Sequence, residues 1–302
     1  TSFGGAYWLW MIILFSFVLQ AVSYEFQNKL GNIFGAKTFQ WFLVLNGIIG
    51  PVLLGGAVAT FFNGSNFVVN KMNITNSLQP VISQWANGSH GLDALLDPWN
   101  LVLGLAVMFL SRILGTFYII NNVNDTAIQE RSKRQLLVNT VPFLVLFLSF
   151  LIRTLLKDGF AENVNDGSIY MEPMKYLNNF VTMWYLLVVL LIGVLMLLYA
   201  LGKTLFTKNY TKGIWFAGIG VVLVVLSLLL CAGWNHTAYY PSNIDIQSSL
   251  TISNSCSSLF TLQTMSVVSI LVPFVVAYIA YVWYVMDKKK LDKEELKDDE
   301  VY

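Results

Sequence analysis

Arg112 is the most unusual charged residue in this sequence, because most of its neighbours along the chain are apolar. It lies in an apolar stretch at 100–120. If that stretch crosses a membrane and ends on the inner side near residue 120, Arg112 lies roughly 12 Å deep at about 1.5 Å per residue. Arginine at the centre of a spanning helix costs about 2.5–3.5 kcal/mol. The guanidinium therefore either extends toward the nearer head groups or pairs with an acid. No apolar stretch of this chain carries a mid-span acid, so the acid would come from another subunit, a cofactor carboxylate or a segment preceding Thr1.

Glu25 is the second candidate, because it ends the first apolar stretch of the chain. One interpretation is a surface acid at the membrane interface. The other is a proton entry point or a contact with a partner subunit.

Residue sets that mark common catalytic and metal sites are missing from the sequence. His90 and His236 both fall outside the apolar stretches, so they cannot hold a buried haem between them. Cys231 and Cys256 lack the spacing of a metal site, and they form one disulfide or none. There is no glycine-rich phosphate loop and no Ser-His-Asp set. We therefore predict no catalytic residue and no metal ligand in this chain.

The elements that position these residues are predicted to be membrane-spanning helices. The chain is 56% apolar and 12% charged, with a mean hydropathy of +0.62, whereas soluble domains are about 25% charged. A helix needs roughly 20 apolar residues to cross the hydrocarbon core, and backbone groups in lipid must be bonded internally. The fold class predicted is an all-α, polytopic transmembrane bundle. Its spans are expected at 7–24, 40–62, 100–120, 136–156, 180–202, 214–233 and 259–286.

Polar and small residues inside these stretches are expected to join neighbouring helices. Interhelical hydrogen bonds are the usual role of mid-span polar side chains, here Gln20, Asn46, Asn139, Thr182 and Gln263. Glycines allow helix backbones to approach closely, and they crowd the second stretch at Gly47, Gly50, Gly55 and Gly56.

The distribution of Lys and Arg predicts the orientation. With the C-terminal tail on the cytoplasmic side, 13 of the 18 basic residues fall on that side and 4 on the other, Arg112 being within a span. Seven spans then put Thr1 outside. The charged tail at 287–302 is expected to be a solvated end. The net charge of +1 predicts no nucleic-acid partner.

Several short motifs, taken in order, resemble a known family. Near the C-terminus these are Tyr239-Tyr240-Pro241-Ser242, Ser257-Ser258-Leu259-Phe260-Thr261-Leu262 and Val272-Pro273, followed by Tyr278, Tyr281 and Trp283. Earlier in the chain they are Ser2-Phe3-Gly4-Gly5-Ala6-Tyr7 and Asp97-Pro98-Trp99-Asn100. The series resembles subunit II of cytochrome bd-type quinol oxidases, and its residues are most similar to those of Bacteroidetes-type members.

The resemblance implies a function for the whole chain. Family members have nine helices, as two four-helix bundles plus a peripheral helix, so seven spans imply an N-terminally truncated fragment. The enzyme oxidises quinol in the bacterial cytoplasmic membrane and reduces oxygen to water. Its haem b and haem d are held by subunit I, on which subunit II packs. Arg112 and Glu25 would then couple this chain to its partner or to the haem environment. Relatives differ at Gln20, Gln40 and Arg112, which weakens any transfer of roles there.

Two other functions remain open from the residues alone. A secondary transporter or permease fragment is the main alternative, although no internal repeat and no buried acid for ion coupling are visible. A structural assembly factor is the other.

Overall fold

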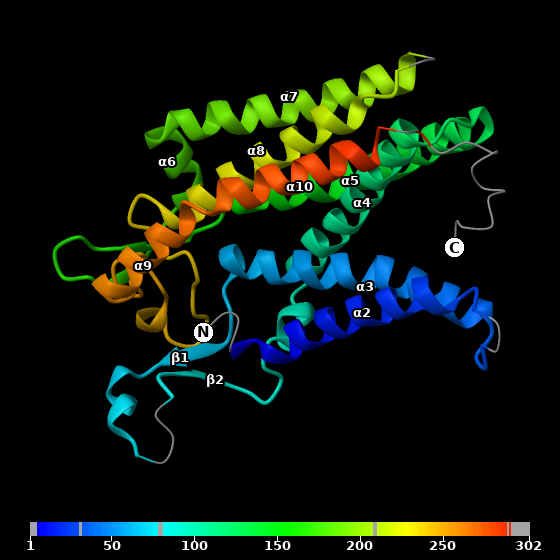
Figure 1. Cartoon of the computed structure of the whole chain (residues 1–302). Helices are drawn as coiled ribbons and strands as arrows, with labels where there is room; N and C mark the ends of the chain where they lie inside the picture. Colours follow the sequence, from blue (N-terminus) through cyan, green and yellow to red (C-terminus); the bar gives the residue numbers. More distant parts are fainter. Residues whose placement is uncertain (1–4, 30–31, 78–80, 208–209, 289, 291–302) are drawn as a thin grey trace.

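The fold is a bundle of long apolar helices, seen in a computed structural model that describes residues 5–29, 32–77, 81–207, 210–288 and 290 (Figure 1). Within those residues, seven helical stretches are long and apolar enough to cross a membrane, which confirms the predicted fold class. They are α2 (Tyr7–Phe26), α3 (Ala36–Asn63), α4 (Pro98–Asn122), α5 (Thr126–Leu156), α7 (Trp184–Phe206), α8 (Gly213–Gly233) and the pair α9 (Leu259–Ser269) and α10 (Val272–Met286).

Helix α5 begins ten residues before the apolar stretch predicted at 136–156. Asp125 caps its start, and one carboxylate oxygen accepts hydrogen bonds from the amides of Ala127 and Ile128 at 2.9 and 3.0 Å. An N-cap of this kind satisfies amides that lack an intrahelical partner. The first turns of α5 carry Arg131 and Arg134, so hydropathy alone did not reveal them.

Two predicted spans are interrupted. The stretch at 180–202 begins in a short helix, α6 (Lys175–Thr182), and α7 starts only after a break at Met183. Thr182 therefore ends α6, so its predicted mid-span position is wrong. The last span breaks at Ile270 and Leu271, before Pro273 opens α10. Proline has no amide hydrogen and is tolerated in the first turn of a helix.

Glycine brings two pairs of helices into backbone contact. A Cβ on Gly55 of α3 would lie 2.8 Å from the Cα of Gly104 of α4. A Cβ on Gly193 of α7 would lie 2.7 Å from the carbonyl oxygen of Gly220 of α8. The predicted close approach is thus confirmed at Gly55. At Gly47 an added Cβ would meet nothing within 4 Å.

A mid-span hydrogen bond joins α2 to α3. The side-chain amide of Asn46 donates to Oε1 of Gln20 at 2.5 Å, as predicted for interhelical polar pairs. Asn139 instead donates to the carbonyl of Gln135 in its own helix, at 2.7 Å, so the interhelical role predicted for it is wrong. Gln263 is exposed on α9.

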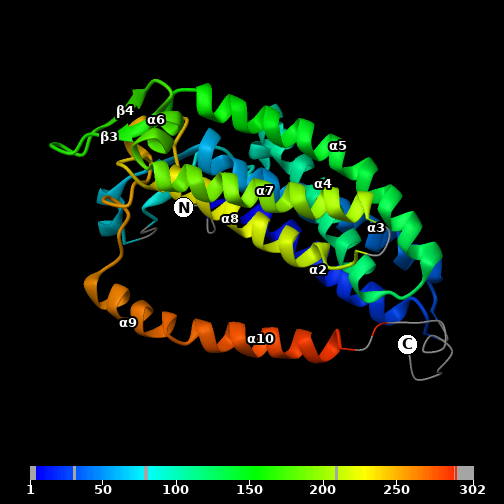
Figure 2. The same cartoon turned by 90° about the horizontal axis from the view of Figure 1, so that it is seen from above.

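The pair α9–α10 stands away from the other helices (Figure 2). None of the residues of this span is buried, whereas the other six spans are 22–39% buried. Contacts near its end are made by Trp283, whose ring lies 5.7 Å from that of Tyr118 on α4. The contacts that join this span to α4 therefore lie at the end of α10 rather than along its length.

Short hairpins gather at one end of the bundle. β1 (Phe67–Val69) pairs with β2 (Ser83–Trp85), and β3 (Gly159–Glu162) pairs with β4 (Ile169–Glu172), both antiparallel. The 3-10 helices η1 (Lys71–Thr75), η2 (Leu92–Leu96) and η3 (Ile246–Ser248) lie in the same loops. We call this end the hairpin side, comprising 64–77, 81–97, 157–183 and 234–258. The opposite end is the basic side, comprising 27–29, 32–35, 123–134, 207, 210–212 and 287–288 (Figure 1). The predicted tail at 287–302 falls largely outside the described residues.

Candidate functional site

Arg112 lies on an open face of α4. The residue is exposed, as are Gly115 and Ile119 one and two turns further along. Among the described residues, its side chain has no hydrogen bond and no ion pair. Its backbone carbonyl accepts from the hydroxyl of Thr116 at 2.7 Å. The guanidinium is therefore presented to whatever surrounds the helix.

Glu25 is paired locally. It forms an ion pair with Lys29, four residues further along, and both side chains are about half exposed. The Lys29 ammonium also lies 5.0 Å from the ring centre of Phe26. An exposed pair of this kind contributes little to stability. The structure does not bring Glu25 and Arg112 into contact, and the surroundings of Glu25 favour the surface-acid interpretation.

The histidines and cysteines lie at or beyond the helix ends of the hairpin side. His90 and His236 lie in loops on the hairpin side, with φ of +42° and +51°, and the ring of His90 lies 4.4 Å from that of Tyr7. Both cysteines are free, Cys231 buried in α8 and Cys256 exposed. Within the described residues no three His, Cys, Asp or Glu side chains gather as metal ligands.

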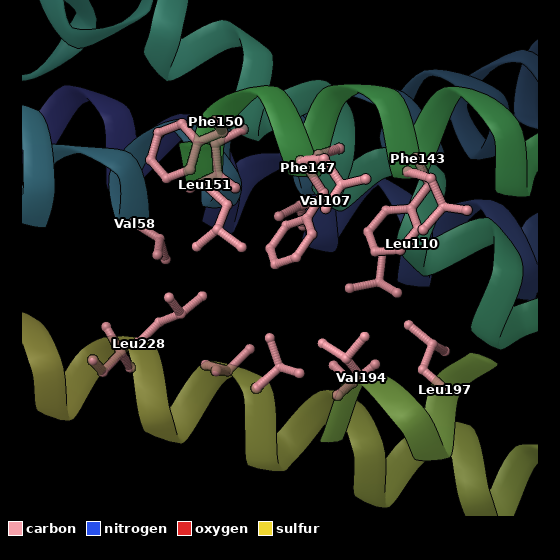
Figure 3. A pocket seen from close by; sticks show the side chains of 18 of the residues that line it. Val58, Val107, Leu110, Phe143, Phe147, Phe150, Leu151, Val194, Leu197 and Leu228 are labelled. Atoms are coloured by element: carbon pink, nitrogen blue, oxygen red, sulfur yellow. The ribbon is translucent and has the colours of Figure 1, made fainter. Parts of the chain in front are cut away.

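A wholly apolar cavity lies between two helix pairs, α4–α5 and α7–α8 (Figure 3). Its volume is about 140 Å³, close to the ~150 Å³ of an engineered cavity that stays dry and binds benzene. Phe143, Phe147 and Phe150 point into it from α5, facing Val194 and Leu228 (Figure 3). Because no side-chain nitrogen, oxygen or sulfur lines it, this space suits an apolar guest and offers no ligand to a metal.

A cluster of cations at the hairpin side was not anticipated. The Oδ1 atom of Asn63, at the end of α3, accepts hydrogen bonds from Nη1 of Arg153 at 3.1 Å and from Nζ of Lys157 at 3.2 Å. The Arg153 guanidinium lies over the Trp99 ring, 4.6 Å from its centre. Asn63 in turn donates to Oδ1 of Asn100 at 2.7 Å. We call Asn63, Trp99, Asn100, Arg153 and Lys157 the cationic cluster.

Burial controls the charge of Lys157. Desolvation and the neighbouring Arg153 lower the pKa of this lysine from its ordinary 10.5 to about 8, although Asp97 partly opposes the shift. The ammonium also donates to the carbonyl of Phe62 at the end of α3. In the sequence, Arg153 and Lys157 contributed only to the number of basic residues predicted on the outer side of the membrane. Nothing in the sequence indicated that α3 brings Asn63 between them.

A second unanticipated contact holds the end of α10. One carboxylate oxygen of Asp287 accepts from the amide of Asn122 at 2.9 Å and from the hydroxyl of Tyr118 at 3.2 Å. Both partners belong to α4. We call Tyr118, Asn122 and Asp287 the α10 latch, and it joins the otherwise separate last span to the bundle at the basic side.

Buried polar residues fix the loops of the hairpin side. Asn179 of α6 donates to the carbonyl of Cys231 at 2.9 Å and to the hydroxyl of Thr237 at 2.8 Å. Glu162 is buried and accepts from the hydroxyls of Thr251 and Ser253 at 3.1 and 3.0 Å. Paired polar groups of this kind make a rigid cap. The geometry supports a structural role for them.

Comparison with known proteins agrees with this architecture. A comparison with curated proteins finds no match. The profile of one family, described as cytochrome bd terminal oxidase subunit II, matches residues 1–286. This confirms the resemblance seen in the motifs and favours it over the permease and assembly-factor alternatives. Because the match covers nearly all of the 302 residues, the chain belongs to the family of cytochrome bd terminal oxidase subunit II.

Proposed function

We propose that this chain is the non-haem-ligating subunit of a quinol:oxygen oxidoreductase and packs on the haem-bearing subunit I. The observation that carries the proposal is the open face of α4. Arg112 is placed within an apolar helix without a partner among the described residues, which is costly in lipid. A carboxylate on a neighbouring subunit at the same depth would remove that cost. Charged groups within spans usually face other protein rather than lipid.

The haems of the complex, of b and d type, belong to the partner in this proposal. Both histidines of this chain lie in hairpin-side loops rather than in a spanning helix, and the cavity between α4–α5 and α7–α8 is apolar throughout. The contribution of this chain is then to bind subunit I, to exclude water from the shared interior and to hold a charge at Arg112 near the interface. Glu25 has the weaker case for a partner contact, because Lys29 already neutralises it.

The complex would lie in the cytoplasmic membrane of a bacterium, with the basic side facing the cytoplasm. In the sequence, Lys and Arg gather in 27–37, 131–134, 203–212 and 288–297, the segments that adjoin that end of the helices. Such an excess is typical of cytoplasmic segments. The hairpin side, where the loops are longest, then faces outward.

Purification of the complete tagged protein from native membranes tests the function. We expect a second large membrane subunit to co-elute, and a reduced-minus-oxidised optical spectrum to show haem bands of b and d type. A colourless eluate containing one subunit, from both well-aerated and poorly aerated cells, would refute the proposal. Substrate-dependent uptake by the chain alone would then favour the permease alternative.

A further inference from the structure

Neither cation of the cationic cluster forms an ion pair among the described residues, although Asp97 acts on Lys157 from a longer distance. Ion pairs within 4.0 Å instead join Lys29 to Glu25 and Lys175 to Glu172. The guanidinium makes one hydrogen bond, from Nη1 to Asn63. Its other N–H groups are available, because a guanidinium carries five donors in a planar fork.

A structural role accounts for part of this arrangement only. Both residues lie at the C-terminal end of α5, where cations interact favourably with the helix dipole. Lys157 also satisfies the carbonyl of Phe62, one of the last of α3. Neither the helix dipole nor the Phe62 carbonyl requires that both cations donate to Oδ1 of Asn63. Asp97, the acid that acts on Lys157, uses one oxygen to cap α4 through the amide of Trp99 at 2.7 Å.

The position of the cluster is that of lipid head groups. Three spanning helices end there, since α3 ends at Asn63, α4 begins at Pro98 and α5 ends at Leu156. Tryptophan is enriched at this depth, and Trp99 supports the guanidinium with its ring. Basic pockets between spanning helices on the cytoplasmic side bind the phosphates of anionic lipids, and the same pairing of cations with phosphate oxygens is expected at the outer interface.

We infer that the cationic cluster binds a phosphate-bearing anion, with the head group of an anionic phospholipid as its occupant. Guanidinium and ammonium groups side by side match the several oxygens of a phosphate. Ile152 and Leu156 flank Arg153 on α5 and are 57% and 56% exposed, which provides apolar surface for an acyl chain. Inorganic phosphate has no apolar part to pack against that surface, so we favour a phospholipid over free phosphate as the ligand.

Native mass spectrometry of the whole complex tests this inference without reference to its oxidase activity. We expect phosphatidylglycerol to be retained in preference to phosphatidylcholine. The double variant Arg153→Gln/Lys157→Gln should bind it roughly 25-fold more weakly, at about fivefold for each lost cation. Lys71→Gln is the matched control, because Lys71 is an exposed lysine on the same side, bonded to the carbonyl of Asn254. It should retain the lipid as the unchanged protein does.

Two further arms decide what the cluster recognises. The variant Arg153→Lys/Lys157→Arg keeps both charges and should keep most of the lipid, which separates lost binding from misfolding. Inorganic phosphate at millimolar concentration should not displace the lipid; complete displacement would assign the site to free phosphate and overturn the lipid assignment. Undiminished retention by the Gln double variant, or equal loss in Lys71→Gln, would overturn the site altogether. If the Gln double variant retained the lipid fully, a carboxylate of the partner subunit would be the expected occupant of the cationic cluster.

Discussion

Gly55 of α3 and Gly104 of α4 lie back to back, so that a Cβ on Gly104 would come within 2.6 Å of the carbonyl oxygen of Val52. The obstacle is backbone and cannot rotate away. This contact lets α3 and α4 cross at short range and holds α2 and α3 against the rest of the bundle.

Gly104→Ala should therefore destabilise the protein. We expect a loss of about 1–3 kcal/mol, as for overpacking of a tight interior, which thermal unfolding of the purified complex would register as a lower Tm. Gly47→Ala is the matched control, because its Cβ would meet nothing within 4 Å and alanine favours helix. Equal melting temperatures for the two variants would contradict the close contact.

Arg112→Leu should weaken assembly with the haem-bearing subunit. Loss of the guanidinium leaves the proposed carboxylate of the partner without a counter-charge, and breaking a buried pair typically costs about 3–5 kcal/mol. Co-purification of the partner should fall and the reduced-minus-oxidised spectrum should change. Arg134→Leu removes an equal charge from an exposed position at the start of α5 and should change neither. Indistinguishable behaviour of the two variants would reject the pairing.

Lipid retention by the cationic cluster should fall as the pH rises past about 8. Desolvation and the neighbouring Arg153 lower the pKa of Lys157 to about 8, and Asp97 and Tyr176 are the other titratable groups near it. A bound phosphate favours the ammonium, so binding above pH 8 requires uptake of a proton. Retention measured between pH 7 and 9.5 should decline, whereas Lys157→Arg should stay flat. A decline in Lys157→Arg of the same size would assign the effect to another group.

The same lysine affects folding in the absence of an anion. Its folded-state pKa lies below the ordinary 10.5, so the unfolded chain binds more protons between about pH 8 and 10.5. The free energy of unfolding should therefore rise with pH across that window. Denaturant titrations of the lipid-free protein, compared with Lys157→Gln, would detect this slope, and an equal slope in both would contradict it.

Asp287→Ala should release the end of α10. The substitution removes the acceptor for Asn122 and Tyr118, and the last span has no buried residue to compensate. We expect amide hydrogen exchange in 279–287 to accelerate about tenfold, equivalent to roughly 1.4 kcal/mol of local stability. Tyr278→Phe, at an exposed position on the same helix, is the control. Unchanged exchange in Asp287→Ala would show that the α10 latch does not hold the helix.

The sequence by itself determined the spanning helices and the family. The backbone N–H and C=O groups of an apolar stretch of about 20 residues have no hydrogen-bond partner in lipid except within a helix. The existence of each span therefore followed from length and composition. Gln20 and Asn46 were recognisable as interhelical partners because polar atoms within a span need one. The motifs around Pro98 and Pro273 indicated the family without any knowledge of contacts.

Only the tertiary structure decided which residues meet. Asn63 and Arg153 are 90 positions apart, and Asn122 and Asp287 are 165 apart. Hydropathy reports which segments are buried in lipid, but it carries no information on which helix ends are neighbours. The early start of α5 and the break at Met183 depend on a cap and on loop packing, which change no average hydropathy. The cationic cluster exists because the ends of α3, α4 and α5 converge, and that convergence depends on how the helices pack, including the α3–α4 contact at Gly55 and Gly104.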